Sequence, residues 1–399
     1  LKMAKKTKGD DEPTTEIQLL GRSKNTLSCG IVGLPNVGKS LMFNMMSNQE
    51  VPSENFPFCT IDPNKARVAV PDERFEWLRK NIRPASEVPA HLEVIDIAGL
   101  VRGAHEGKGL GNAFLSNIRA VDGIYHLVRL FDDDMVTHVE GEVDPVRDLS
   151  IIHDELVFKD IATLERKIAE CQNAINKGMS SNKDAKDMLP VLHKCLENLK
   201  NNVDARNVDW KSAEIPIIRD LFLLTSKPVI YLINMSAKDY LRKKNKWLKK
   251  VVAWIKESSK TDPIIPFSAQ YEQELHYMTP EEQAALEAEG KGTALKKIIA
   301  TGYRALHLIH FFTVGVREVR CWTIREGCKA PDAAGVIHSD FRDNFICAEV
   351  TRYDDLVEYG GEAEAKAAGK VTMEGRNYVV QDGDIMFFKA GQGQKKGKK

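Results

Sequence analysis

The sequence predicts an α/β protein in which a mostly parallel sheet is interrupted by an antiparallel helical insertion and followed by a small β-rich domain. Apolar, strand-like runs alternate with helical patterns on both sides of the insertion. The insertion carries apolar residues at heptad spacing, and the last domain has short strands between glycine turns. From these patterns we expect a flexible tail (1–24), a core domain (25–150 and 216–307), a helical hairpin (151–215), a β-rich domain (308–390) and a basic tail (391–399).

The composition indicates a protein of the cytoplasm. At 399 residues the chain has room for about two to three domains. Its seven cysteines are scattered without a C-x-x-C pair, which indicates reduced thiols rather than disulfides or a zinc site. No apolar run is long enough to predict a membrane span, so we expect a cytoplasmic monomer without a membrane partner. Lys+Arg and Asp+Glu both total 57, so net charge neither favours nor excludes nucleic acid.

The first strand-like run, 28–32, leads into the most informative stretch of the chain. Residues 33–40 read G-L-P-N-V-G-K-S and match the phosphate-binding pattern G-x-x-x-x-G-K-[ST], with a helix-like run at 41–46 after them. Successive backbone N–H groups of such a loop surround phosphate oxygens. Lys39 would reach the β- and γ-phosphates, and Ser40 would ligate Mg²⁺. The residues expected to bind the nucleotide here are Asn36, Val37, Gly38, Lys39, Ser40 and Leu41.

The residues of a hydrolytic switch follow the phosphate-binding loop in order. Thr60, in the proline-punctuated segment 55–63, is positioned to be a second hydroxyl ligand of Mg²⁺. The next strand-like run ends at Asp96, which would hold a metal-bound water, and the Gly99 N–H would meet the γ-phosphate. Five glycines within residues 99–111 predict a mobile loop. In this order the motifs indicate a GTPase-like switch in which the phosphate-loop lysine and Gly99 stabilise the transferring phosphoryl group.

Two apolar seams predict the helical hairpin. The first comprises Val157, Ile161, Leu164, Ile168, Cys171 and Ile175, and the second Met188, Leu192, Cys195 and Leu199. Their spacing is typical of packed helices, so we expect no chemistry there. After a further strand at 227–234, one basic amphipathic helix is expected across residues 241–255. Its cations at 242–250 form either a solvated face or a surface for a phosphate-rich partner.

Four parts of the chain resemble the Obg-like ATPase (YchF-type) family of translation-factor-class P-loop proteins. They are G-L-P-N-V-G-K-S at 33–40, N-F-P-F-C-T-I-D-P at 55–63, D-I-A-G-L-V at 96–101 and the final β-rich domain. The resemblance covers residues from about 20 to 390. It implies a Ras-like P-loop NTPase core, a coiled-coil insertion and a C-terminal TGS domain. It also implies ribosomes or ribosomal subunits, with rRNA contact, as partners.

One departure from ordinary GTPases concerns the attacking water. A glutamine often follows D-x-x-G, but residue 100 is leucine, which cannot hydrogen-bond to water. His105, in the glycine-rich loop, and His138, after an acidic run, are the candidates to orient the water instead. From the residues alone, either can equally be a surface histidine; the resemblance favours His138. A potassium ion or a partner protein is the alternative.

A second departure concerns the base. Guanine is normally selected by N-K-x-D, whose aspartate accepts hydrogen bonds from the base, but the chain has N-M-S-A at 234–237. The resemblance supports adenine instead. The groups it puts around the base are Asn234, the Met235 backbone, Phe131 and Val314. The family usually carries glutamate in place of Ala237, and a shifted register that offers Asp239 to guanine stays open.

Together these features predict a Mg²⁺-dependent nucleoside triphosphatase that hydrolyses ATP, with GTP as a second candidate substrate, and acts as a ribosome-associated switch. Slow turnover is expected because the glutamine is missing. Two alternatives stay open: a guanine-specific ribosomal GTPase, and a regulatory module in which the nucleotide only controls conformation with little turnover.

Overall fold

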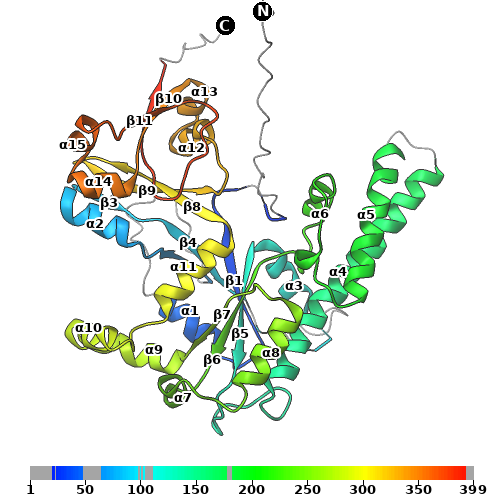
Figure 1. Ribbon diagram of the computed structural model, residues 1–399. Coiled ribbons are helices and arrows are strands. Elements are labelled where there is room, and N and C mark those ends of the chain that lie inside the picture. The colour runs from blue at the N-terminus through cyan, green and yellow to red at the C-terminus, as the bar shows by residue number, and fades with distance from the viewer. Residues whose placement is uncertain are drawn as a thin grey trace, which may run out of the picture.

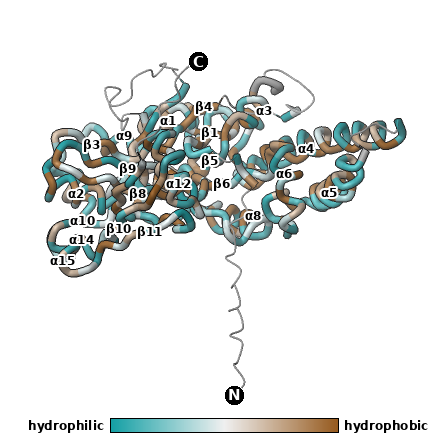
Figure 2. Tube along the Cα trace, turned by 90° about the horizontal axis from the view of Figure 1, so that it is seen from above, coloured by the Kyte–Doolittle hydropathy of each residue, from teal (hydrophilic) through white to brown (hydrophobic). Residues whose placement is uncertain are grey.

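The structure is a computed structural model that describes residues 20–22, 24–47, 64–97, 99, 102–103, 111–177 and 182–391. A central sheet forms the core of the molecule (Figure 1). A long helical hairpin extends from one side of this sheet, and a second sheet with its own helices lies on the opposite side (Figures 1 and 2). The central sheet thus lies between the helical hairpin and the second sheet (Figure 1).

The central sheet is mostly parallel, as predicted. Its strands are β1 (Ser28–Val32), β2 (Lys65–Ala69), β4 (His91–Asp96), β5 (Gly123–Arg129), β6 (Val229–Asn234) and β7 (Ile264–Phe267). Their order is β2-β4-β1-β5-β6-β7, and only β2 runs antiparallel to its neighbour. Every residue of β1, β5 and β6 is buried, which explains their continuous apolar runs. Because the carboxyl ends of parallel strands meet at one edge, the loops that follow them converge there.

The core domain also contains helices that surround this sheet or connect its strands. They are α1 (Lys39–Ser47), α2 (Glu73–Ile82), α3 (Gly111–Ala120), α6 (Ile215–Leu221), α7 (Ala237–Arg242), α8 (Leu248–Ser258), α9 (Ala269–His276), α10 (Pro280–Ala288) and α11 (Leu295–Ala305). Met42 and Met46 of α1 and Ile298 and Ile299 of α11 are fully buried in the same apolar cluster as the strands. Burial of this face, rather than helix propensity, holds the short helices in place.

The single basic helix expected across residues 241–255 is wrong, because the structure has α7 and α8 with a break between them. Lys243 takes a left-handed backbone conformation (φ 53°), which ends α7. Asn245 then fixes the break: its amide nitrogen donates to the Leu130 carbonyl oxygen (3.0 Å), and its oxygen accepts from the Trp247 N–H (2.9 Å). A tertiary contact with the end of β5 therefore overrides the local helical pattern.

The hairpin consists of α4 (Pro145–Asn176) and α5 (Asn182–Lys200), followed by a short 3-10 helix (Ala205–Asn207). Asp144 caps α4 by accepting hydrogen bonds from N–H groups of its first turn, and Pro145 needs no such partner. The first turns of α4 pack into the main core, and its later turns form a second apolar cluster with α5. Seven of the ten predicted seam residues are buried in that cluster: Val157, Leu164, Ile168, Cys171, Leu192, Cys195 and Leu199.

The second sheet has the order β11-β10-β12-β8-β9-β3. Its elements are β8 (Leu308–Val314), β9 (Glu318–Arg325), β10 (Phe345–Thr351), β11 (Thr372–Glu374) and β12 (Ile385–Ala390), with α12 (Ala330–Ile337), α13 (Ser339–Asp343), α14 (Tyr353–Tyr359) and α15 (Glu362–Ala367). The remaining strand, β3 (Ser86–Val88), comes from the core domain and pairs in parallel with β9. Sequence reasoning missed β3 because three residues carry no periodic signal.

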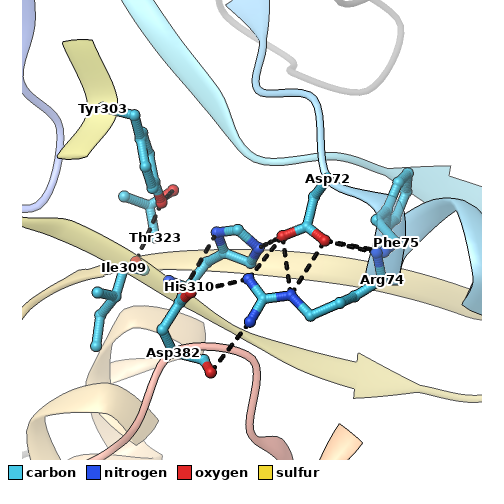
Figure 3. A network of polar contacts seen from close by, with 8 residues as sticks. All are labelled: Asp72, Arg74, Phe75, Tyr303, Ile309, His310, Thr323 and Asp382. Atoms are coloured by element: carbon cyan, nitrogen blue, oxygen red, sulfur yellow. Dashed lines mark hydrogen bonds and ion pairs between the residues drawn. The ribbon is translucent and has the colours of Figure 1, made fainter. Parts of the chain in front are cut away.

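A buried polar network also joins the two domains, at the start of α2 (Figure 3). Asp72 caps α2 by accepting from the Arg74 N–H (2.7 Å), and its carboxylate lies 2.9 Å from His310 Nε2 on β8. Arg74 continues the network to Asp382, with 2.9 Å between Nη2 and Oδ2. Burial raises the pKa of the Asp72 carboxyl, but hydrogen bonds from His310 and Arg74 hold this pKa well below its usual range.

The substitution Asp72→Ala should lower the free energy of unfolding by about 3 kcal/mol, because it removes a helix cap and the carboxylate that pairs with both Arg74 and His310. The difference from wild type should shrink as pH falls below about 4, because the folded-state pKa lies below the unfolded value. Urea denaturation at several pH values measures both effects.

The control is Glu76→Ala on the same helix, where the ion pair with Arg79 is exposed. It should change stability by less than about 0.5 kcal/mol. Equal losses in the two variants would show that the network adds nothing.

Candidate functional site

The phosphate-binding loop lies between β1 and α1, at the edge where the parallel strands end. Asn36 (φ 62°) and Gly38 (φ 101°) have left-handed backbone conformations that turn the loop back on itself. A side chain is excluded at Gly33, because a Cβ there would lie 2.6 Å from the Leu127 carbonyl oxygen. Backbone contacts therefore set the shape of the loop, as a cradle of N–H groups requires.

Lys39 and Ser40 open α1 and meet Asp96 at the end of β4. Ser40 Oγ donates to Asp96 Oδ2 (3.0 Å), and Lys39 Nζ donates to the Leu34 carbonyl oxygen (2.7 Å). Burial lowers the pKa of Lys39 to about 8, although the charge of Asp96 opposes this. Burial also raises the pKa of Asp96, against the effects of Ser40 and Lys39. The structure thus brings Asp96 to two adjacent residues of the phosphate-binding loop, from which it is more than fifty positions away in the sequence.

These residues fit a magnesium ion. Asp96 Oδ1 is buried and has no hydrogen-bond partner among the described residues. A buried carboxylate oxygen of this kind needs a donor or a cation, and Mg²⁺ and its water supply both. The Ser40 hydroxyl beside it is the expected first ligand. Thr60, the second expected ligand, lies outside the described residues, as do Leu100 and His105.

Gly99 lies directly against the lysine of the loop. A Cβ at Gly99 would be 3.0 Å from Lys39 Nζ and equally close to the Pro35 backbone nitrogen. Only glycine lets the backbone approach the amine and the loop so closely. Gly99 and Lys39, which are both expected to contact the γ-phosphate, are therefore neighbours in the structure.

Asn234 has a larger structural role than the sequence suggested. Its side chain is 3% exposed; Nδ2 donates to the Val37 carbonyl oxygen (2.9 Å), and Oδ1 accepts from the Ala269 N–H (3.0 Å). It thereby ties the phosphate-binding loop to the loop after β7. Ser268 and Ala269 of that loop were missed as site residues; the available signal was that the strand ends in two small residues. Ser268 is fully buried and caps α9.

Two other expected base-pocket residues flank Asn234. Phe131 is half-buried after β5, and the Arg129 guanidinium lies 4.5 Å from its ring centroid. Met235 follows Asn234, but its side chain is buried and its N–H donates to the Phe267 carbonyl oxygen (2.9 Å). Because this N–H is already paired, only the other backbone atoms of Met235 can contact a base.

Val314, the last expected base-pocket residue, belongs to another sheet. This residue ends β8 in the second sheet, where it pairs with Val319. The turn between them bonds to the segment after α2, through the Ala85 N–H and the Val316 carbonyl oxygen (3.1 Å). Asn234 belongs to the central sheet instead. The sequence did not reveal which sheet this strand joins, and the place of Val314 beside the base stays a prediction.

His138 lies next to the phosphate-binding loop, but its ring points inward. Asn36 Nδ2 donates to the Thr137 carbonyl oxygen (3.1 Å), which fixes the histidine's loop beside the site. His138 Nε2 is 2.9 Å from Asp148 Oδ2, and Nδ1 accepts from the Glu140 N–H (3.1 Å). Both ring nitrogens are occupied and the side chain is only 3% exposed. In this arrangement His138 has no free nitrogen for a water.

Comparison with known proteins identifies the family. A family model described as a 50S ribosome-binding GTPase matches residues 28–155, and one for the C-terminal region of YchF GTPases matches residues 308–391. Obg-like ATPase 1 of Oryza sativa subsp. japonica is 54% identical over 97% of this chain and 98% of its own length. Obg-like ATPase 1 of Homo sapiens is 51% identical over 96% of each chain.

A solved structure entitled "Structure of the Schizosaccharomyces pombe YchF GTPase" is 48% identical, with a TM-score of 0.85 over 92% of this chain and 99% of that one. The chain belongs to the YchF family of Obg-like ATPases. This YchF-family protein is therefore a P-loop enzyme that hydrolyses nucleoside triphosphates. In the part of the chain that the structure describes, no helix combines the length and apolarity needed to cross a membrane.

The lowered pKa of Lys39 predicts pH-dependent nucleotide affinity in this YchF-family protein. The dissociation constant for ATP with Mg²⁺ should increase as pH rises above about 8, because the free amine loses the proton that attracts the phosphates. Titrations of a fluorescent ATP analogue between pH 7 and 9.5 measure this.

Lys39→Arg provides the control, since arginine stays charged throughout this range. Its affinity is expected to be weaker overall but flat with pH. Parallel pH curves for the two proteins would contradict the assignment of the titration to Lys39.

Proposed function

We propose that this protein is a Mg²⁺-dependent ATPase that acts as a ribosome-associated switch. The observation that carries the proposal is the convergence of Lys39, Ser40, Asp96 and Gly99 at one edge of the central sheet. Lys39 and the Gly99 N–H are arranged to stabilise charge on a transferring phosphoryl group. Few reactions other than phosphoryl transfer need a buried lysine next to a hydroxyl group that is itself hydrogen-bonded to a carboxylate.

Magnesium would be held by Ser40 and Thr60, with Asp96 binding one of its waters. The ion would neutralise charge on the β- and γ-phosphates. Asp96 is prepared for this role, because one of its oxygens already orients the Ser40 hydroxyl and the other is buried without a donor in the described residues. The segments around Thr60 and after Gly99 would then act as the switch loops.

ATP is preferred to GTP in this proposal. Ala237 offers no carboxylate to guanine. Asp239, the alternative acceptor, already accepts a hydrogen bond from Asn245 Nδ2 (2.8 Å). Recruiting it would remove one of the two hydrogen bonds that this half-buried amide donates, which costs free energy. The names of the relatives differ in the nucleotide they indicate, since one protein is called an ATPase and another a GTPase.

His138 is proposed to orient the attacking water once its ring leaves Asp148. The anchoring of Thr137 to Asn36 supports this role, because it keeps the histidine's loop beside the phosphates. Apo geometry does not rule out a catalytic base whose hydrogen bonds form only with substrate. His105 and a potassium ion stay as alternatives for the same role.

The α4–α5 hairpin would be the coiled-coil insertion of the family and the second sheet its TGS domain. The match to a model described as a 50S ribosome-binding GTPase supports a ribosomal partner. Lysines at 242–250 and 395–399 are compatible with rRNA contact. A cytoplasmic monomer is proposed.

Phosphate release measured on full-length protein should show that Lys39→Ala abolishes ATP hydrolysis, because the phosphates lose their main cation. His138→Ala should lower kcat about 10- to 100-fold with little change in KM, since the water is used only in the chemical step. Unchanged rates in both variants would instead favour a regulatory module that hydrolyses nothing itself.

Competition between ADP and GDP for a fluorescent nucleotide tests the base preference. ADP should bind at least about tenfold more tightly, which corresponds to one lost hydrogen-bonding group for guanine. An Ala237→Asp variant should gain affinity for GDP. A clear preference of the wild-type protein for GDP would support the guanine-specific alternative.

A further inference from the structure

One helix contacts both loops that flank the phosphate-binding loop. Asp148, in the first turn of α4, is paired with His138, and Glu155 Oε1 accepts from the Gly103 N–H (2.6 Å). Gly103 lies four residues after Gly99, in the loop expected to meet the γ-phosphate. Both carboxylates are buried, at 4% and 3% exposure.

The spacing of the two carboxylates is set by the helix. Seven residues separate Asp148 from Glu155, which is about two turns, so both side chains lie on the same face of α4. The same helix then continues into the hairpin without an internal proline. The arrangement of the two loops is thus fixed relative to one rigid element.

The hydrogen bonds of His138 define what Asp148 does. Because the Glu140 N–H must donate to Nδ1, the ring proton is on Nε2 and points at Asp148. Arg147 also donates to the other oxygen of this carboxylate (3.2 Å). A bond to a buried carboxylate is stronger than one to a neutral acceptor. The His138 ring must break its hydrogen bond to Asp148 before it has a free nitrogen. The strength of this bond therefore limits how often His138 can bind a water.

We propose that Asp148 and Glu155 are positioning residues of the nucleotide site. Asp148 restrains His138 in the inward orientation, and Glu155 holds the backbone at Gly103. The proposal rests on the proposed function, in which His138 orients the water and Gly99 contacts the γ-phosphate. It adds that α4, the first helix of the hairpin, controls both.

The test is ATP turnover of full-length variants, analysed as kcat and KM. Asp148→Ala should raise kcat about tenfold with KM nearly unchanged, because a charged hydrogen bond no longer holds His138 inward. Asp148→Asn should give a smaller rise, since its amide oxygen still accepts from Nε2–H. In a His138→Ala background, Asp148→Ala should have no effect, a result that a merely structural role would not give.

Glu155 is tested in the same way. Glu155→Leu should lower kcat about tenfold in both backgrounds, because the Gly103 N–H loses its acceptor and the donors of this loop are less well ordered. Glu155→Gln keeps an acceptor and should retain most of the activity. The matched control is Asp154→Asn on the same helix, whose side chain is 54% exposed, and it should match wild type.

Amide hydrogen exchange separates this proposal from the proposed function. Asp148→Ala should speed exchange at 136–141, and Glu155→Leu should speed it at 102–103, whether or not the protein hydrolyses ATP. Unchanged exchange in these segments, or an Asp148→Ala variant that slows or leaves unchanged a His138-dependent turnover, would overturn the proposal. A normal rate in His138→Ala alone would overturn only the water-orienting role assigned to that residue.

Discussion

The buried side-chain amide of Asn234 is the contact on which the nucleotide site depends. It bonds to the Val37 carbonyl oxygen on one side and to the Ala269 N–H on the other, so that three loops share one side chain. Leaving either bond unmade in the interior costs about 1–3 kcal/mol. Gly38 is part of the same constraint, because a Cβ there would lie 2.7 Å from Asn234 Nδ2. The glycines of the phosphate-binding loop permit its conformation, and the contacts with neighbouring segments hold that conformation in place.

Much of the fold and the phosphate end of the site could be predicted because their signals are local. Buried strands read as apolar runs, and Lys39 and Ser40 belong to one contiguous motif. The rest depends on contacts between distant segments. The break at Lys243 is fixed by Asn245 reaching β5, and the pairing of Val314 is decided by the second sheet. His138 could be named as a candidate, but its orientation is set by Asp148, ten residues away on another element.

Besides the pairing of β3 with β9, side-chain contacts connect the core and the C-terminal region. Polar contacts link Asp72 and Arg74 to His310 and Asp382. Apolar packing is continuous as well, since Phe312 of the second sheet belongs to the same buried cluster as the central strands. The residues of this junction come from α2, β8 and the segment before β12, whereas Lys39, Asp96 and Asn234 of the nucleotide site lie at the start of α1 and the ends of β4 and β6.

The exchange of β3 between sheets has a consequence for how this chain can be divided. A protein shortened after α11 would keep β3 but lose β9, the strand that satisfies its backbone groups. An unpaired strand edge of this kind readily recruits a strand from another molecule. Asp72 would lose His310 and Arg74 would lose Asp382 at the same time. The C-terminal region therefore completes the structure of the nucleotide domain, and a stop codon ahead of β9 would expose the edge of β3 to aggregation.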